Sequence, residues 1–373
     1  MSLLDTASLI VTPNGVKEGK LYSVIPSDGS GDMSVVRATT ATRVNSAGLV
    51  ELVPYNLLQY SEQFNNAAWD FVNVATITAN TTTAPNGTLT ADTITFTAST
   101  SSCVAQSVSS PAGSTTLSVY AKVASGTKQF RLRIDASGGN SSTNFTATTE
   151  WQRFEFNVTT SVAGTNFYVI NDSTGTAGSI YIWGAQLVEG STAKDYQKTE
   201  TRLNIPRLDY SNGTCPSLLV EPQRTNLLLN SSSFDNWLNA GGSVTSNTTT
   251  APDGTTTADT LTGARYQGGL SSNTWTFSCY AKKLNGDNKF VLRLDEPTTN
   301  YAQFDLNTGT IDFVSSGYNA TITAVENGWY RCTLTTPPST SIVNIVLVSA
   351  NSSTYSTYVW GAQLEAGSYP TSY

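Results

Sequence analysis

One ten-residue segment occurs twice in this chain and constrains its fold more than any other feature. The first copy reads Tyr181-Ile-Trp-Gly-Ala-Gln-Leu-Val-Glu-Gly190, and the second reads Tyr358-Val-Trp-Gly-Ala-Gln-Leu-Glu-Ala-Gly367. The second copy lies almost at the end of the sequence. This placement indicates a module that closes on this segment, and a chain that contains the module twice.

Further motifs repeat in the same order ahead of each copy. Leu49-Val-Glu51 and Asn56-Leu-Leu58 return 170 residues later (from 56 to 226) as Leu219-Val-Glu221 and Asn226-Leu-Leu228. The run Thr81-Thr-Thr-Ala-Pro-Asn-Gly-Thr-Leu-Thr-Ala-Asp-Thr-Ile-Thr95 returns as Thr248-Thr-Thr-Ala-Pro-Asp-Gly-Thr-Thr-Thr-Ala-Asp-Thr-Leu-Thr262. The Pro-Asn-Gly and Pro-Asp-Gly triplets are tight-turn sequences. The lead-in was therefore duplicated together with the module.

The repeated segments have the pattern of short β-strands. Ser118-Val-Tyr-Ala-Lys122 and Gln129-Phe-Arg-Leu-Arg-Ile-Asp135 alternate apolar and polar residues, and a glycine-containing connection between them predicts a hairpin. The second copy adds another strand–turn–strand signal, Phe304-Asp-Leu-Asn-Thr-Gly-Thr-Ile311. Helical periodicity is nearly absent. We therefore predict an all-β protein with two tandem jelly-roll β-sandwiches, in which Trp183 and Trp360 fill the space between the sheets.

These patterns predict four regions along the 373 residues. Residues 1–54 form a small β-rich segment, too short to bury a core of its own, which we expect to attach and oligomerise the protein. The first jelly roll covers residues 55–199 and the second covers residues 225–373. Residues 200–224, which contain three prolines, link the two modules.

Composition excludes several classes of function. The net charge is −7 and no basic stripe is present, so a nucleic-acid-binding surface is not expected. The apolar runs are far shorter than the ~20 residues of a membrane helix. The N-terminus has no basic region followed by an apolar stretch, so we expect no signal peptide and synthesis in a cytoplasm.

The four cysteines, Cys103, Cys215, Cys279 and Cys332, have no metal-like spacing. Cys279 and Cys332 each replace an apolar residue of the first copy, Val119 and Phe154. We therefore interpret them as buried free thiols, with a Cys279–Cys332 disulfide as the alternative.

The chain contains no histidine, which excludes Ser–His–Asp catalysis and histidine-based metal sites. A glycosidase would need two carboxylates at a defined separation. The candidates for such a pair are Asp135, Glu150, Asp295, Glu296 and Glu326. Because Asp at a strand end commonly starts a turn, we expect no enzymatic activity.

Taken in order, the repeated motifs resemble a known family. They are Asn-Leu-Leu followed by Phe and Trp (Asn56 to Trp69, Asn226 to Trp237), Pro-Asp-Gly-Thr, Ser-x-Tyr-Ala-Lys, Gly-Trp-Tyr-Arg-Cys and Tyr-Val-Trp-Gly-Ala-Gln-Leu-Glu. The series is similar to the carbohydrate-binding-module-like jelly rolls of tailed-phage head fibre and head spike proteins. The resemblance covers roughly residues 40–373, and the first copy departs from it by lacking the Asp-Leu-Asn-Thr-Gly hairpin.

The resemblance implies a virion structural protein, assembled in the host cytoplasm, that adheres to host or mucosal glycans. Its partners would be capsid or tail proteins, through the N-terminal segment, and sister chains, with a trimer favoured over a dimer. The alternatives are a tail fibre or baseplate receptor-binding protein, a glycan-binding adhesin unrelated to phages, and a depolymerase. Neither nucleic-acid binding nor membrane insertion is expected.

Glycan binding in such modules uses exposed aromatic rings, on which the apolar faces of sugars stack. The aromatic residues in turn-rich or polar contexts are Trp69, Trp237, Tyr266, Trp275 and Tyr318. Each of them has the alternative role of capping a hydrophobic core. Asp92 and Asp259 repeat in the Thr-Ala-Asp-Thr motif and are candidates for a structural calcium site, or for a hydrogen bond to a turn backbone. No other cofactor is expected.

Overall fold

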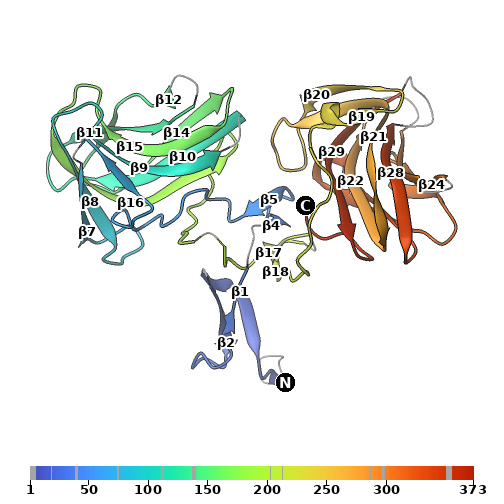
Figure 1. The fold of residues 1–373 in the computed structure, drawn as a ribbon. Helices are drawn as coiled ribbons and strands as arrows, with labels where there is room; N and C mark the ends of the chain where they lie inside the picture. Colours follow the sequence, from blue (N-terminus) through green and yellow to red (C-terminus); the bar gives the residue numbers. More distant parts are fainter. Residues whose placement is uncertain are drawn as a thin grey trace. The chain divides into compact units, whose positions relative to one another are not determined.

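The computed structural model describes the chain except residues 1–5, 18, 38–40, 74, 111–112, 137–139, 202, 212, 285–287, 296–298 and 350–354. The chain folds into two compact units (Figure 1). The first contains Met1–Ala41 and Leu52–Pro206, and the second contains Thr42–Glu51 and Arg207–Tyr373. The second unit therefore includes a ten-residue segment that precedes the first module in sequence, which differs from the predicted boundaries at residues 54 and 225.

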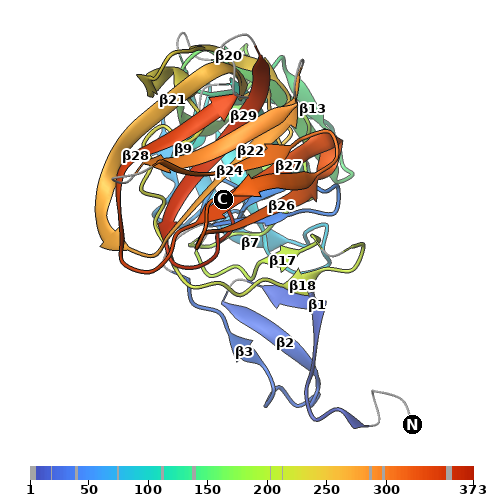
Figure 2. The same ribbon diagram turned by 90° about the vertical axis from the view of Figure 1, so that its right-hand side faces the viewer.

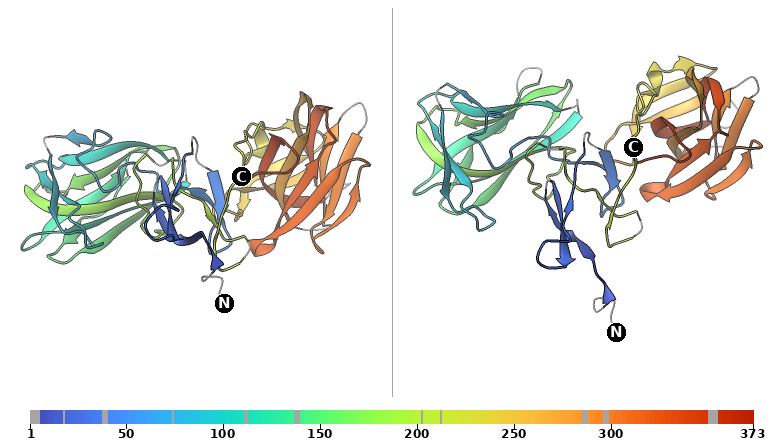
Figure 3. Two further views of the ribbon diagram at one scale, coloured as in Figure 1. Left: turned by 90° about the horizontal axis from the view of Figure 1, so that it is seen from below. Right: turned by 60° about the horizontal axis from the view of Figure 1, so that its bottom comes forward.

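The first unit begins with a three-stranded antiparallel sheet, drawn in dark blue (Figures 1 and 3). Its strands are β1 (Ile10–Lys17), β2 (Lys20–Ile25) and β3 (Met33–Ser34), paired in this order. Asp32 ties the sheet together, because its carboxylate accepts the Ser23 backbone N–H at 2.8 Å and pairs with Lys20 Nζ at 2.8 Å.

The rest of the first unit is a sandwich of two antiparallel sheets. One sheet has the order β14-β10-β16-β8-β7 and the other has the order β12-β11-β15-β9-β6, with β13 beside β11. The strands are β6 (Asp70–Val72), β7 (Thr76–Thr82), β8 (Ala91–Phe96), β9 (Cys103–Ser110), β10 (Gly113–Lys122), β11 (Lys128–Ile134), β12 (Asn140–Ser141), β13 (Phe145–Ala147), β14 (Gln152–Thr160), β15 (Gly164–Asn171) and β16 (Gly178–Glu189).

The second unit repeats this sandwich, and its long strands are seen in Figure 2. Strands β25-β24-β23-β28-β21 form one layer and β21-β29-β22-β27-β26 form the other, because the long strand β21 takes part in both. The elements are β19 (Leu238–Asn239), β20 (Ser243–Thr249), β21 (Ala258–Asn273), β22 (Trp275–Lys283), β23 (Lys289–Asp295), β24 (Thr299–Asp305), β25 (Thr310–Val314), β26 (Asn319–Val325), β27 (Trp329–Thr335), β28 (Thr340–Ser349), β29 (Ser356–Ala366) and the short 3-10 helices η1 (Phe234–Asn236) and η2 (Glu326–Gly328). The predicted all-β fold with two jelly rolls is confirmed.

Two short hairpins lie mostly in the second unit, and only Ala41, Leu52 and Val53 of them belong to the first unit. The first pairs β4 (Ala41–Val44) with β5 (Val50–Val53), and the second pairs β17 (Leu208–Asp209) with β18 (Ser217–Leu218). We call them the first and the second hairpin. They are the duplicated lead-in segments of the sequence, and each carries an Arg–Glu ion pair: Arg43 with Glu51 at 2.9 Å, and Arg207 with Glu221 at 2.8 Å.

Each sandwich has its own core, built by the alternation of the strands. On β11 every second side chain faces inward, namely Phe130, Leu132 and Ile134, and all three are fully buried. Phe290, Leu292 and Leu294 of β23 do the same in the second unit. Burying each such side chain contributes roughly 1.5–3 kcal/mol, which explains why the alternation fixes the register of the strands.

Two expectations from the sequence need correction. The segments at residues 118–122 and 129–135 do not form a hairpin, because β10 pairs with β14 and β16 in one sheet while β11 lies in the other. Trp183 and Trp360 are buried as predicted, but they lie on the outer faces of their sheets. The glycine that follows each Trp, Gly184 or Gly361, has φ near +60° and forms a β-bulge. The bulge shifts the alternation of the strand by one residue, so that the residue after the glycine faces the core again.

The additional hairpin of the second copy is confirmed, since β24 and β25 pair with Asp305 opposite Thr310. In the described part of the chain, no helix has the length and the apolar character needed to cross a bilayer. The described elements that position candidate sites are therefore strands and the turns between them.

Candidate functional site

The five aromatic residues predicted to bind glycans lie in different environments. Four of them belong to the hydrophobic cores: Trp69, Trp237, Trp275 and Tyr318. Trp69, for example, is 2 % exposed, and its indole N–H donates to the Tyr60 carbonyl at 3.1 Å. A buried ring offers no face to a sugar, so these four residues cap the cores. Only Tyr266 is partly exposed.

Tyr266 belongs to a row of residues across the outer face of one sheet in the second unit. The strand register places Tyr266 opposite Val346, Val346 opposite Arg293, and Arg293 opposite Tyr301. Their inward-facing neighbours, such as Leu292 and Leu347, are fully buried. Because side chains alternate between the two faces, the row points away from the core.

A third aromatic ring extends this row at the edge of the sheet. Phe313 of β25 lies 45 % exposed and stacks on Tyr301, with ring centroids 4.6 Å apart and planes inclined by 30°. A stacked pair with one exposed ring gives a flat apolar surface beside polar groups. That combination suits the faces and hydroxyl groups of a sugar.

Charged side chains lie next to the aromatic row. Arg293 Nε lies 3.0 Å from Asp295 Oδ1, and Asn344 donates to Asp295 Oδ2 at 3.5 Å. Lys289 Nζ pairs with both Asp305 and Asp312 at 2.7 Å, and these hydrogen bonds raise the lysine pKa. The face therefore carries fixed donors and acceptors of hydrogen bonds. We call Tyr266, Arg293, Asp295, Tyr301 and Phe313 the second-unit face.

The first unit carries the equivalent arginine–aspartate pair on its own outer face. Arg133 Nη2 lies 2.5 Å from Asp135 Oδ1, and the guanidinium lies over the Tyr168 ring at 5.3 Å. The Tyr168 hydroxyl donates to the other oxygen of Asp135. Burial, together with this hydrogen bond, raises the pKa of Tyr168 to about 12, so the phenol remains a donor. We call Arg133, Asp135 and Tyr168 the first-unit face.

The arginines and Tyr168, Tyr301 and Phe313 were not among the residues predicted from the sequence. The sequence does contain a signal for the two arginines, because both repeated segments, Gln129–Asp135 and Lys289–Asp295, end in the motif Arg-x-Asp. Asp135 and Asp295 were noted only as carboxylates at strand ends. The tyrosines carried no shared signal, since Tyr168 lies on β15 and Tyr301 on β24.

Asp92 and Asp259 hold the backbone at equivalent positions of the two modules. The two oxygens of Asp92 accept the N–H groups of Phe64 and Asn80, both at 2.9 Å. Asp259 accepts those of Phe234 and Asn247 at 2.9 and 3.0 Å. Burial raises the pKa of both carboxyl groups. Within the described ranges, no three acidic or cysteine side chains cluster as metal ligands, and calcium binding at these aspartates stays a prediction.

The cysteines that the structure places in the cores are free thiols. Cys279 and Cys332 face each other across β22 and β27 without a disulfide, and Cys103 is also buried. Burial raises the pKa of the Cys103 thiol to about 11, so the reactive thiolate is scarce at neutral pH. Cys215 is exposed.

The carboxylates considered for catalysis are not arranged as a pair in any described contact. Asp135 and Asp295 belong to different units, and each is paired with the arginine two residues before it. Glu150 and Glu326 are exposed, and Glu296 lies outside the described residues. Of the five candidates, the two aspartates are therefore engaged in ion pairs with arginines.

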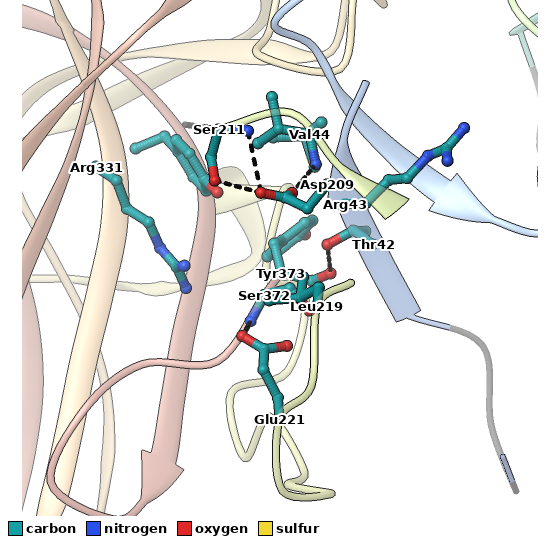
Figure 4. A pocket seen from close by; sticks show the side chains of 12 residues that line it. Thr42, Arg43, Val44, Asp209, Ser211, Leu219, Glu221, Arg331, Ser372 and Tyr373 are labelled. Carbon is teal, nitrogen blue, oxygen red and sulfur yellow. Dashed lines mark hydrogen bonds between the residues drawn. The ribbon is translucent and has the colours of Figure 1, made fainter. Parts of the chain in front are cut away.

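A small cavity of about 170 Å³ lies in the second unit between the two hairpins and the module (Figure 4). Its acidic side chains are already engaged. Asp209 accepts the Val44 N–H at 2.7 Å and the Ser211 N–H at 3.0 Å, and Glu221 accepts the Ser372 N–H at 2.9 Å. The cavity therefore belongs to the packing of the hairpins rather than to an open binding site.

No protein-family model matches the chain, and no curated protein matches it. Among solved structures, the chain is similar to the tandem CBM22 modules of Paenibacillus barcinonensis Xyn10C, with 13 % identity, a TM-score of 0.29, and 89 % of this chain and 100 % of that chain covered. The tandem CBM51 modules of a Streptococcus pneumoniae family 98 glycoside hydrolase give 12 % identity, a TM-score of 0.25, and 80 % and 97 % coverage. The enzymatically active domain of bacteriophage CBA120 tailspike protein 4 gives 18 % identity, a TM-score of 0.26, and 36 % and 21 % coverage. At these TM-scores the assignment of the fold depends on the strand order described above.

Proposed function

We propose that this chain is a non-catalytic glycan-binding protein whose two β-sandwich modules use the outer faces of their sheets. One observation carries the proposal. An Arg–Asp pair is repeated at the same position of both modules, and in each it lies beside a tyrosine on the solvent side of the sheet. Guanidinium and carboxylate groups hydrogen-bond to hydroxyl groups, and the rings supply the apolar contact.

The experiment is a glycan array with the full chain, followed by calorimetry of the best ligand. Tyr301→Ala removes the ring next to Arg293, and we expect affinity to fall about tenfold or more if the second-unit face binds the sugar. Tyr369→Ala is the matched control, because this exposed tyrosine lies outside the sheet. Absence of any binding on the array, or equal binding by the two variants, would contradict the proposal.

The same substitution in the first unit, Tyr168→Ala, tests whether both modules bind. Two weak sites on one chain would gain avidity on a surface that displays many glycans. We expect each single variant to retain binding to an immobilised glycan, and the double variant to lose it.

For the biological setting we propose a structural protein of a tailed-phage virion, of the head fibre or head spike type. Its support is the ordered series of motifs from Asn56 to Gly367 that resembles those proteins. Attachment through residues 1–54 and a trimeric assembly belong to this proposal. Mass spectrometry of purified virions is the test, and a chain detected only outside the particles would contradict it.

A further inference from the structure

The two hairpins of the second unit are copies of one element that contact each other reciprocally. Arg43 Nη1 donates to the Leu208 carbonyl at 3.1 Å, and Arg207 Nη1 donates to the Thr42 carbonyl at 3.0 Å. Each arginine also pairs with the glutamate at the end of its own hairpin. Each arginine thus reaches a carbonyl on the first strand of the other hairpin, although the two carbonyls are not at equivalent positions. From this shared sequence and similar pattern of contacts we expect a similar role for the two hairpins.

The first hairpin covers an aromatic cluster on the second module. Val50 is 5 % exposed, packs with Tyr280, Trp329 and Trp360, and donates its N–H to the Pro252 carbonyl at 2.9 Å. Leu49 lies over the neighbouring turn, where a Cβ on Gly254 would lie 3.2 Å from Leu49 Cδ1. Under this cover Trp329 is only 1 % exposed.

The first module carries the same cluster, and among the described residues more of it is exposed. Trp183 packs there with Tyr120, Trp151 and Tyr196, in the positions of Trp360, Tyr280, Trp329 and Tyr373. Trp151 and Tyr120 are partly exposed, whereas their counterparts are buried.

The turn beside this cluster is open as well. A Cβ on Gly87, the counterpart of Gly254, would meet nothing within 4 Å. Leu89 in the same turn is 63 % exposed, where the second module has Thr256. The first module thus presents an apolar patch at the place that the first hairpin covers on the second module. We call Leu89, Tyr120 and Trp151 the open patch.

The segment directly after β18 of the second hairpin presents the matching apolar residue to solvent. Val220 is the counterpart of Val50, 170 residues later (from 50 to 220), and it is 79 % exposed. Leu218 in the same hairpin is 40 % exposed. Burial of the exposed Val220 side chain would contribute about as much free energy as burial of Val50 does.

We infer that the second hairpin of one copy docks on the open patch of a second copy of this chain, as the first hairpin docks on the second module. Val220 would fill the place of Val50, and its N–H would reach the Pro85 carbonyl, the counterpart of Pro252. The two surfaces differ, so the contact is heterologous and joins copies head to tail, into a ring if the rotation closes. The inference is independent of the proposed glycan function.

Sedimentation of the full chain tests this interface. We expect a mass that is a multiple of 39.7 kDa. Val220→Asp on the hairpin and Leu89→Asp on the patch should each weaken self-association about tenfold or more, because docking would bury an unpaired carboxylate. Val162→Asp changes an equally apolar residue, 45 % exposed outside both surfaces, and should leave the mass unchanged.

All three positions are exposed, so unchanged melting temperatures will show that the variants are folded. A monomeric wild-type chain, or assembly that survives both interface substitutions, would overturn the inference.

Cross-linking between two differently labelled chains tests whether the segment docked on the open patch comes from a second copy. One chain carries Pro85→Cys and the other Val220→Cys, both in a Cys215→Ser background that removes the exposed thiol. Mixing them under oxidising conditions should give a disulfide-linked heterodimer. Each variant oxidised alone should give less disulfide-linked dimer. A disulfide that forms only in a chain carrying both cysteines, as a monomer, would overturn the assignment to a second copy.

Discussion

Lys128 and Asp172 form a buried ion pair that closes one end of the first sandwich. Lys128 Nζ donates to Asp172 Oδ2 at 2.6 Å, to Asn171 Oδ1 at 2.7 Å and to the Gln129 carbonyl at 2.7 Å. All three donor positions of the ammonium group are therefore used. Burial acts to raise the pKa of Asp172, but hydrogen bonds from Lys128 and Thr174 outweigh it, so the pKa lies well below its usual value.

We expect Lys128→Met to lower the free energy of unfolding of the first unit by about 3–5 kcal/mol, because Asp172 is left buried without its cation. Chemical denaturation followed by hydrogen exchange in residues 128–172 measures the loss. The double variant Lys128→Met/Asp172→Asn should recover most of it. A single variant as stable as the wild type would show that the pair is not coupled to folding.

A second pair sets a pH dependence in the other unit. The hydrogen bond from Lys289 lowers the pKa of Asp305 from 3.8 to about 2. A carboxyl group whose pKa is lower in the folded state stabilises the fold at pH values above its unfolded pKa. That contribution is lost as the pH falls through the folded pKa. Stability should therefore fall between about pH 4 and pH 2.

The measurement is an NMR titration of the Asp305 carboxyl carbon. We expect a midpoint near 2 in the wild type and a return towards 3.8 in Lys289→Met. The slope of stability against pH in this window should decrease in the same variant. An unchanged midpoint would mean that Lys289 does not hold this carboxylate.

At the scale of single elements, a β-bulge in β16 and another in β29 change which face of the sheet the following side chains point to. Gly361 has φ +61°, and a Cβ there would lie 3.1 Å from Tyr280 Cδ2 and 3.3 Å from Tyr373 Cε2. Gly184 repeats this geometry in the first unit with φ +64°. The bulge turns Trp360 to the outer face while Val359 and Ala362 remain in the core.

Gly361→Ala should cost about 1–3 kcal/mol of stability, because the left-handed backbone and the close rings both oppose a side chain. Gly268→Ala in β21 is the control, since a Cβ there meets nothing within 4 Å and its φ is ordinary. Urea denaturation of the two variants gives the difference. Equal stability would argue against the bulge as the cause of the Trp position.

The elements also show where sequence reasoning succeeds and where it stops. The alternation of apolar and polar residues predicted the strands of both sandwiches. Each strand buries only one of its faces, so every second side chain must be apolar. The alternation did not predict which sheet each strand joins, since residues 118–122 and 129–135 alternate equally well in a hairpin or in two layers. The bulge at Gly184 shifts the alternation by one residue, and Trp183 was therefore assigned to the wrong face. Tyr168 and Tyr301 were missed because neither lies in a motif that the two copies share.

At the scale of the whole molecule, sequence order and structural units do not coincide. The first hairpin precedes the first module, yet Val50 packs into the second unit. We expect Val50→Ala to destabilise the second unit by about 1–2 kcal/mol and to leave the first unit unchanged. Hydrogen exchange by mass spectrometry resolves peptides from each unit. Loss of protection in the first unit alone would contradict this division of the chain.

The hydrogen bonds that Arg43 and Arg207 donate to each other's hairpins depend on the presence of both repeats in one chain. Unequal recombination that deletes one repeat would remove one hairpin and leave the other arginine without the carbonyl it holds. Neither the Arg43–Leu208 nor the Arg207–Thr42 hydrogen bond could then form within one chain.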